Sequence, residues 1–179
     1  MGQVDPDRFI FLDESNAKTT MSRRHGRAPR GERVVDHVPA GQYHSTTILG
    51  GLRLDGTIAA LVYEGGTTVE VMRAFAAGEL QKVLRPKDIV VMDNLAAHKD
   101  GQVVAAIEAA GAIACYLPPY SPDLNPIEKM WSKVKEILRA IKARTAEALI
   151  DAIAQALQAV TASDAEAWFE HCGYDGNTE

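Results

Sequence analysis

Two short, largely apolar runs that each end at an aspartate constrain this chain more than any other feature. RFIFL precedes Asp13, and DIVVM precedes Asp93. Runs of about five apolar residues bounded by polar ones are typical of buried strands, which need helices on both faces of their sheet. The two runs therefore predict strands at 8–12 and 88–92 in an α/β fold.

Three further strands are predicted from the residues around these two. Segments 44–54 and 57–63 are β-rich and flank Asp55-Gly56, the pair preferred in a two-residue hairpin turn. The apolar run at 112–117 predicts the last strand. The segment 14–42 is rich in Gly, Pro, Arg and Ser, so we expect a long loop there, and such a loop is usually functional or mobile.

Helical periodicity predicts the remaining elements. The first expected helix starts at a Thr67-x-x-Glu70 capping box and is weakened or divided at Gly78, the second stops at Gly111, and the last is capped by Ser163-x-x-Glu166. The predicted helices span 67–84, 98–110, 126–142, 146–160 and a final segment after 163. The element order indicates a mixed five-stranded sheet flanked by helices, with extra helices at the C-terminal end.

Length and composition predict one soluble domain. The 179 residues suit a single domain, with a core of about 8–142 and a C-terminal helical extension of about 145–171. Only Cys115 and Cys172 are present, which argues against a disulfide framework and favours a reducing cytoplasm. No run approaches the ~18 apolar residues of a membrane span, so no membrane partner is expected.

The net charge of −5 averages over very uneven segments. Residues 18–33 carry +5 and residues 125–144 carry +4, whereas seven acids and no Lys or Arg follow Arg144. Local basic patches can bind a polyanion whatever the total charge. Runs of like charge also occur on faces that only contact water, so composition leaves both interpretations open.

Asp13 and Asp93 each follow a predicted buried strand. Ligands of open α/β sheets bind beyond the carboxyl ends of the parallel strands, so adjacent parallel strands would place both carboxylates at one edge. Two acids there would repel each other unless a cation lay between them, and oxygen ligands of that kind suit magnesium or manganese. The alternative is that each aspartate is a helix cap or a turn residue.

Glu128 opens the predicted helix 126–142 and shares a face with Ser132, Lys135 and Arg139. A carboxylate leading a row of cations suits a metal ligand on a helix that also contacts phosphate. Asn125-x-x-Glu128 is equally compatible with a capping-box variant. The other face of this helix is apolar and is expected to be core: Ile127, Met130, Trp131, Val134, Leu138 and Ile141.

Three motifs resemble the catalytic domain of DDE transposases: FLDES around Asp13, VVMDNLAAHK around Asp93, and LPPYSPDLNPIEKMW around Glu128. The 34 residues between Asp93 and Glu128, and the final Glu, resemble the bacterial insertion-sequence branch of the mariner superfamily. The basic segment GRAPRGERV is similar to the family's as well. The resemblance covers residues 8–170 and implies a ribonuclease-H-like fold.

The resemblance implies that Asp13, Asp93 and Glu128 are catalytic and hold two divalent ions, Mg²⁺ or Mn²⁺. Water would free a 3′-OH at the end of the element, and that hydroxyl would attack a target phosphodiester. Asn94 and His98 lie in the matched motif, where they either orient ligands and phosphate or are ordinary turn and helix residues. The candidate DNA contacts are Arg23, Arg24, Arg27, Arg30, Lys129, Lys135 and Arg139.

The resemblance also implies the partners. Double-stranded DNA, as transposon ends and as target, would be bound by a homodimer. Family members usually carry N-terminal helix-turn-helix segments, whereas the first catalytic strand here begins at Arg8, so we expect that domain to be absent and supplied by a separate chain from an upstream frame. The expected function is a metal-dependent DNA endonuclease and strand-transferase. The alternative is a catalytically idle remnant that acts as a DNA-binding or dimerising module.

Overall fold

The computed structural model describes residues 4–37, 39–40 and 43–174. Residues 1–3, 38, 41–42 and 175–179 lie outside the described residues, and with them parts of the predicted loop 14–42 and of the acidic C-terminal segment.

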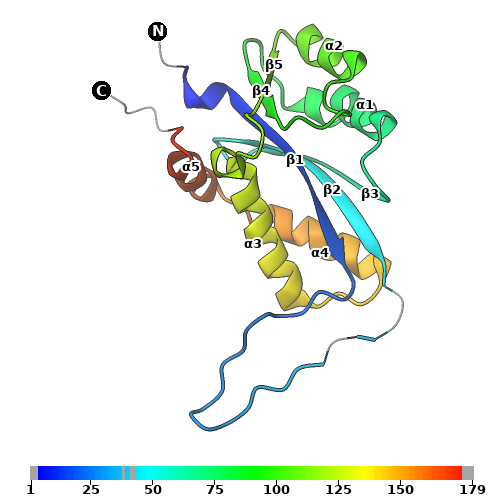
Figure 1. Ribbon diagram of the computed structural model, residues 1–179, viewed down its shortest axis with the longest axis vertical. Helices are drawn as coiled ribbons and strands as arrows, with labels where there is room; N and C mark the ends of the chain where they lie inside the picture. The colour runs from blue at the N-terminus through cyan, green and yellow to red at the C-terminus, as the bar shows by residue number, and fades with distance from the viewer. Residues whose placement is uncertain (1–3, 38, 41–42, 175–179) are drawn as a thin grey trace.

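Within the described residues, five strands form one mixed sheet, as predicted (Figure 1). The strand order is β3-β2-β1-β4-β5. β1 is antiparallel to β2 and parallel to β4, while β3 is antiparallel to β2 and β5 is parallel to β4. The strands span Phe9–Lys18 (β1), Ser45–Arg53 (β2), Ile58–Glu64 (β3), Ile89–Met92 (β4) and Ile113–Tyr116 (β5).

In the described part of the chain, five α-helices cover the two faces of this sheet (Figure 1). They are α1 (Val69–Ala77), α2 (Gly101–Ala109), α3 (Pro126–Ile141), α4 (Ala146–Gln158) and α5 (Ala162–His171), with short 3₁₀ turns at Pro6–Arg8, Leu80–Lys82 and Pro122–Leu124. Side chains alternate along β1, so Ile10 and Leu12 pack with α1 and α2, whereas Phe11 packs with α3, α4 and α5. The C-terminal helices therefore contribute directly to one of the two cores. None of the helices in the described part is long and apolar enough to cross a membrane.

The helix starts differ from the predicted ones by a residue or two. Thr68, not Thr67, caps α1 by accepting a bond from the Val71 N–H, and Gly78 ends the helix there. The capping box of α5 is formed by Thr161 and Asp164 instead of Ser163 and Glu166. Neighbouring Ser and Thr residues offer the same cap chemistry, so the sequence alone does not select between them.

Two further helix predictions are corrected. The predicted helix 98–110 begins only at Gly101, because Asp100 caps it, and the preceding residues form a turn. Gly111, with φ +77°, follows its end as predicted. The Asn125 side chain makes no cap bond to α3, so the alternative interpretation of Asn125-x-x-Glu128 as a capping-box variant is wrong. Of the predicted apolar stripe on α3, all but Ile141 are buried; Ile141 is 42% exposed.

The hairpin turn is one residue longer than predicted. Leu52 lies opposite Ile58, and the Arg53 N–H donates to the Thr57 carbonyl at 3.0 Å, which leaves 54–56 as the loop. Gly56 has φ +80° and donates to the Arg53 carbonyl at 3.1 Å. A type I turn closed by a left-handed glycine is a common three-residue hairpin loop.

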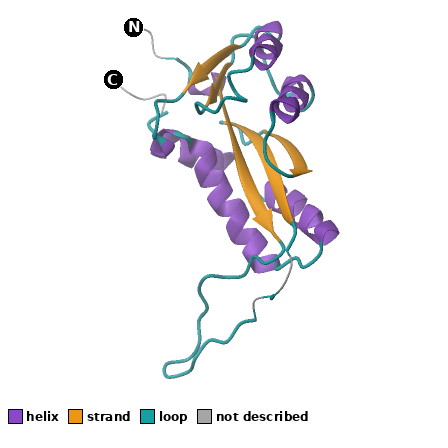
Figure 2. Cartoon of the chain, turned by 45° about the vertical axis from the view of Figure 1, so that its right-hand side comes forward, coloured by secondary structure: helices purple, strands orange, loops and turns teal. Residues whose placement is uncertain are grey.

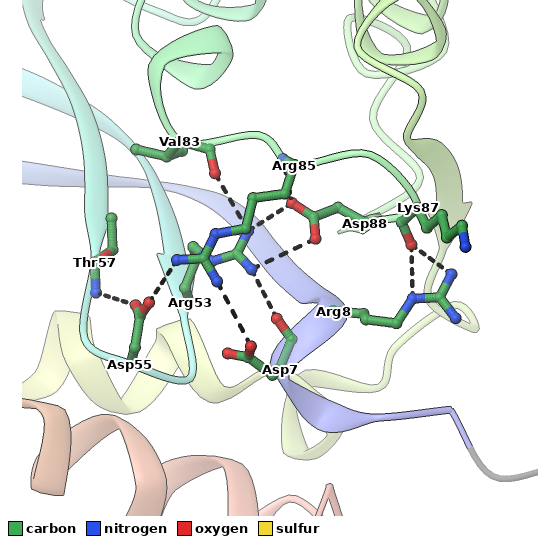
Figure 3. Close-up of polar contacts among 9 residues, drawn as sticks. All are labelled: Asp7, Arg8, Arg53, Asp55, Thr57, Val83, Arg85, Lys87 and Asp88. Atoms are coloured by element: carbon green, nitrogen blue, oxygen red, sulfur yellow. Dashed lines mark hydrogen bonds and ion pairs between the residues drawn. The ribbon is translucent and has the colours of Figure 1, made fainter.

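A buried ion pair between Arg53 and Asp88 holds one end of the sheet (Figure 3). The two side chains are 1% and 3% exposed. The Arg53 guanidinium also donates to the carbonyls of Asp7 (2.7 Å) and Val83 (3.2 Å), and Asp88 accepts from the Arg85 N–H at 2.7 Å. Because Asp88 directly precedes β4 and Arg53 ends β2, this network fixes the end of the sheet opposite the carboxyl ends of β1 and β4.

The described residues between β1 and β2 extend as a long arm away from the sheet and helices (Figures 1 and 2). The predicted loop thus starts after Lys18, because β1 is longer than predicted. Its base is tied to the end of α3: Lys142 Nζ contacts Asp36 at 2.6 Å, and Arg144 donates to the carbonyls of Thr19 (2.7 Å) and Met21 (2.9 Å).

Candidate active site

Asp13 and Asp93 occupy equivalent positions on two adjacent parallel strands. Phe11 of β1 lies opposite Val91 of β4, and each aspartate comes two residues later. Asp93 directly follows β4, as predicted. Asp13 does not end its strand, because β1 continues to Lys18 in antiparallel pairing with β2. The predicted convergence holds nevertheless: both carboxylates line one cleft at the edge where the pairing of β1 with β4 stops.

This cleft has a volume of about 430 Å³. Glu128, in the first turn of α3, supplies its third carboxylate. The opposite wall is the segment after β5, in which Tyr120 is fully exposed and has φ +58°. The structure thus brings together all three carboxylates of the sequence motifs.

Asp13 is half-buried beneath α3 and bonded to it. The Trp131 indole Nε1–H donates to Asp13 Oδ2 at 3.1 Å. Gly50 is paired with Asp13 on β2, and a Cβ atom at that position would lie 2.7 Å from the Trp131 ring, so the glycine makes room for the indole. Burial, followed by the neighbouring Glu128 carboxylate, raises the pKa of Asp13 to about 7.

Asp93 is held by its own turn and by His98. Asp93 Oδ1 accepts from the Leu95 N–H at 2.9 Å and lies 2.7 Å from His98 Nδ1. The His98 side chain is fully buried, and it lies in the turn before α2, so the interpretation as a first-turn helix residue is wrong. Among the described residues Asn94 makes no hydrogen bond to a carboxylate; its Nδ2 donates to the Leu117 carbonyl at 2.6 Å and ties this turn to the end of β5.

Glu14 is the residue at this site to which sequence reasoning assigned no role. Its Oε2 lies 3.6 Å from His98 Nε2, and burial raises the pKa of its carboxyl. The alternation along β1 carries a signal for it: Glu14 follows Ile10 and Leu12 on the face that α1 and α2 cover. An acid on a buried face is uncommon without a partner.

The donor chemistry of the cleft fits hard divalent cations, since Asp13, Asp93 and Glu128 offer only oxygen ligands. Burial and then repulsion from Glu128 raise the pKa of Asp13, and a bound cation would favour the ionised carboxylate in place of the proton. The ligands are not preassembled, however: within the described residues, no three His, Cys, Asp or Glu side chains are placed to hold an ion as they stand. Two of the carboxylates are instead bonded to Trp131 and His98.

Residues 8–150 match the family model of the DDE superfamily endonucleases. The chain belongs to this superfamily. It is 32% identical over 103 residues to the transposable element Tcb1 transposase of Caenorhabditis briggsae, a stretch that covers 57% of this chain and 36% of that protein.

Solved structures share the fold of this DDE superfamily chain. A pre-cleavage Mos1 transpososome matches with a TM-score of 0.73 at 15% identity, covering 98% of this chain and 58% of that one. The catalytic core domain of BIV integrase matches with a TM-score of 0.55 at 15% identity, covering 94% and 99%. The ribonuclease-H-like fold is thereby confirmed, and the chain spans little more than a third of the Tcb1 transposase.

The predicted DNA contacts of this DDE domain fall into two groups. Arg23, Arg24 and Arg139 line one hollow of about 400 Å³ between the base of the arm and α3, and Arg27 lines the next hollow with the first two. Burial and then the nearby Arg24 guanidinium lower the pKa of Arg139. The structure does not place the others in either hollow: Arg30 and Lys129 are exposed, and Lys135 is half-buried on α3.

Proposed function

We propose that this chain is the catalytic domain of a mariner-superfamily transposase of the bacterial insertion-sequence branch, a metal-dependent DNA endonuclease and strand-transferase. The observation that carries the proposal is the shared cleft of Asp13, Asp93 and Glu128, which come from two adjacent parallel strands and a helix. Membership of the DDE superfamily and the similarity to the Tcb1 transposase support it.

In this proposal the three carboxylates hold two divalent ions, Mg²⁺ or Mn²⁺. Mos1 paired-end complexes have been solved with each of these metals. The ions would supply activation of the attacking oxygen and stabilisation of the leaving one. The residues of the chain contribute orientation: Trp131 fixes Asp13, the turn after β4 fixes Asp93, and α3 carries Glu128.

The substrate is double-stranded DNA, and the reaction has two parts. Attack by water on a phosphodiester at the transposon end breaks the P–O3′ bond and leaves a 3′-OH and a 5′-phosphate. Attack by that 3′-OH on a target phosphodiester forms the new P–O bond, breaks the target P–O3′ bond and releases the target 3′-OH. The basic hollow formed by Arg23, Arg24 and Arg139 suits the phosphate backbone. The Mos1 transposase is solved as a paired-end complex with a transposon end, which supports a dimer on DNA here.

The test combines metal binding with cleavage. Mn²⁺ should raise the melting temperature of the wild-type chain, because a ligand that binds only the native state stabilises it. Asp93→Asn should remove most of this shift and should abolish nicking of a duplex that carries the element's ends. A wild-type chain that binds DNA but neither responds to Mn²⁺ nor nicks DNA would instead fit the catalytically idle remnant.

A further inference from the structure

His98 lies between two carboxylates of the candidate site. Its imidazole Nδ1 is 2.7 Å from Asp93 Oδ1, and its Nε2 is 3.6 Å from Glu14 Oε2. The side chain of His98 is fully buried, while that of Glu14 is 22% exposed and that of Asp93 is 45% exposed. The buried ring thus links Glu14, on the sheet face that α1 and α2 cover, to Asp93 in the open cleft.

Two buried polar atoms at this contact are unsatisfied. Neither His98 Nε2 nor Glu14 Oε2 has a hydrogen-bond partner among the described residues. Leaving buried polar atoms without partners is unfavourable, and the two atoms face each other. If the two side chains moved slightly closer, one hydrogen bond between His98 Nε2 and Glu14 Oε2 would satisfy both atoms.

The other contacts of His98 fix its position. The Tyr116 hydroxyl of β5 donates to the His98 carbonyl at 3.2 Å, so the backbone of the turn is held from the neighbouring strand. The ring is then held by Glu14 of β1 on one side and by Asp93 after β4 on the other. A packing role alone does not account for two carboxylates that face the two ring nitrogens of His98.

We propose that Glu14 and His98 are positioning residues for Asp93. The inference rests on the proposed function, in which Asp93 is a metal ligand. His98 Nδ1–H donates to Asp93 Oδ1, which also accepts from the Leu95 N–H, so Oδ2 is the oxygen available to an ion. Glu14 acts through His98: it sets the orientation of the ring and therefore of the carboxylate. Hydrogen-bonded partners of this kind orient metal ligands and commonly change affinity when removed.

Conservative and non-conservative variants separate this role from a packing role. Glu14→Leu and His98→Leu remove the two polar links, whereas Glu14→Gln and His98→Asn keep an amide N–H that can donate to His98 Nε2 or Asp93 Oδ1, respectively. Titration calorimetry with MnCl₂ should show affinity reduced by about 10–100-fold in both Leu variants and largely retained in the amide variants. Thr47→Val is the matched control, because the Thr47 hydroxyl of β2 bonds to Asn16 of β1 and to the Gly65 carbonyl, and no bond to Asp93 is found among the described residues.

A nitrogen-detected NMR spectrum of the metal-free protein gives a second readout that needs no ion. Wild-type His98 should show a ring protonated at Nδ1, and Glu14→Leu should shift the Nε2 resonance, because that nitrogen loses the group that faces it. Because Glu14 is partly exposed, its variant tests the proposal even where His98→Leu does not fold.

The outcomes distinguish the two proposals. Unchanged Mn²⁺ affinity and an unchanged His98 signal in Glu14→Leu would overturn the positioning role, provided that Asp93→Asn loses Mn²⁺ binding. Mn²⁺ affinity that survives Asp93→Asn as well would overturn the metal site of the proposed function. Equal loss of affinity in Thr47→Val would also overturn the positioning role, because the effect would then belong to the sheet surface in general.

Discussion

The Trp131 indole donates its N–H to Asp13 Oδ2 at 3.1 Å, which joins the helix of the third motif to the strand of the first. Trp131 is buried, so its one polar atom needs a partner, and the carboxylate provides it. The arrangement depends on Gly50, which pairs with Asp13 and leaves room for the indole ring. The position of this acid is therefore set by packing as well as by the strand.

The first prediction concerns that close approach. In Gly50→Ala the new Cβ would lie 2.7 Å from the Trp131 ring, so the indole or the strand must shift. We expect a loss of about 1–3 kcal/mol in the free energy of unfolding, measured by urea denaturation, and a smaller Mn²⁺-induced shift in Tm. Gly66→Ala is the control, since a Cβ there meets nothing within 4 Å. Equal costs for the two variants would show that the Trp131 contact does not constrain Asp13.

The second prediction concerns the buried pair at the other end of the sheet. Asp88→Asn leaves the Arg53 guanidinium buried without its counter-charge, which typically costs about 3–5 kcal/mol. Arg85→Gln, which breaks exposed pairs with Asp55 and Asp7, should cost under about 1 kcal/mol. Chemical denaturation measures the loss in the free energy of unfolding for both variants. A cost for Asp88→Asn no larger than that for Arg85→Gln would mean that the pair adds little to the native state.

Local sequence patterns were enough to predict five strands and the place of Asp93, but not the order of the strands in the sheet. The apolar run ends at the last residue of β4, so the end of the run marks the end of the strand, and Asp93 follows it. The end of the apolar run predicted the end of β1 too early. The second half of β1 contains exposed polar residues, yet it continues as a strand because it pairs with β2. Pairing with a distant strand leaves no trace in the local alternation.

The contacts within the site were beyond the reach of the sequence for a related reason. His98 meets Glu14 because β1 and β4 are adjacent, and Trp131 reaches Asp13 because Gly50, the partner of Asp13 on β2, leaves room for the indole. Motif matching selects the residues that carry the chemistry, but the neighbours that hold them come from tertiary packing. The predicted cap of α1 was one residue off, because Thr67 and Thr68 carry equivalent hydroxyls and Thr68 forms the cap.

The third prediction concerns acid stability. The Lys133 ammonium and the Thr161 cap lower the pKa of Asp164 from its ordinary value of 3.8 to about 2. A carboxyl whose pKa is depressed on folding stabilises the native state above its unfolded pKa, and this contribution is lost as the pH falls toward its folded pKa. The wild-type Tm should therefore drop between about pH 4 and pH 2, and Asp164→Asn should flatten part of that drop while lowering Tm at pH 6.

Asp151→Asn is the control for this titration, because Asp151 is an exposed aspartate of the neighbouring helix α4. It should follow the wild-type curve. If Asp164→Asn kept the full wild-type slope between pH 4 and pH 2, the link from α5 to Lys133 of α3 would not contribute to stability.

The last prediction concerns the basic face of α3. Lys135 and Arg139 lie on the same face as Glu128, and Arg139 shares a hollow with Arg23 and Arg24. Each cation that neutralises a phosphate releases about one counterion, so Lys135→Gln with Arg139→Gln should reduce the slope of log K against log salt by about two. Affinity should fall uniformly across DNA sequences, because phosphate contacts carry no sequence information. Fluorescence anisotropy with a repeat-bearing duplex and a scrambled duplex between 50 and 200 mM salt measures both quantities.

The matched double variant, Lys82→Gln with Arg85→Gln, removes two exposed cations that are paired with acids away from the cleft, and it should leave the slope unchanged. Equal slopes for the two double variants would assign the α3 cations to a face that only contacts water.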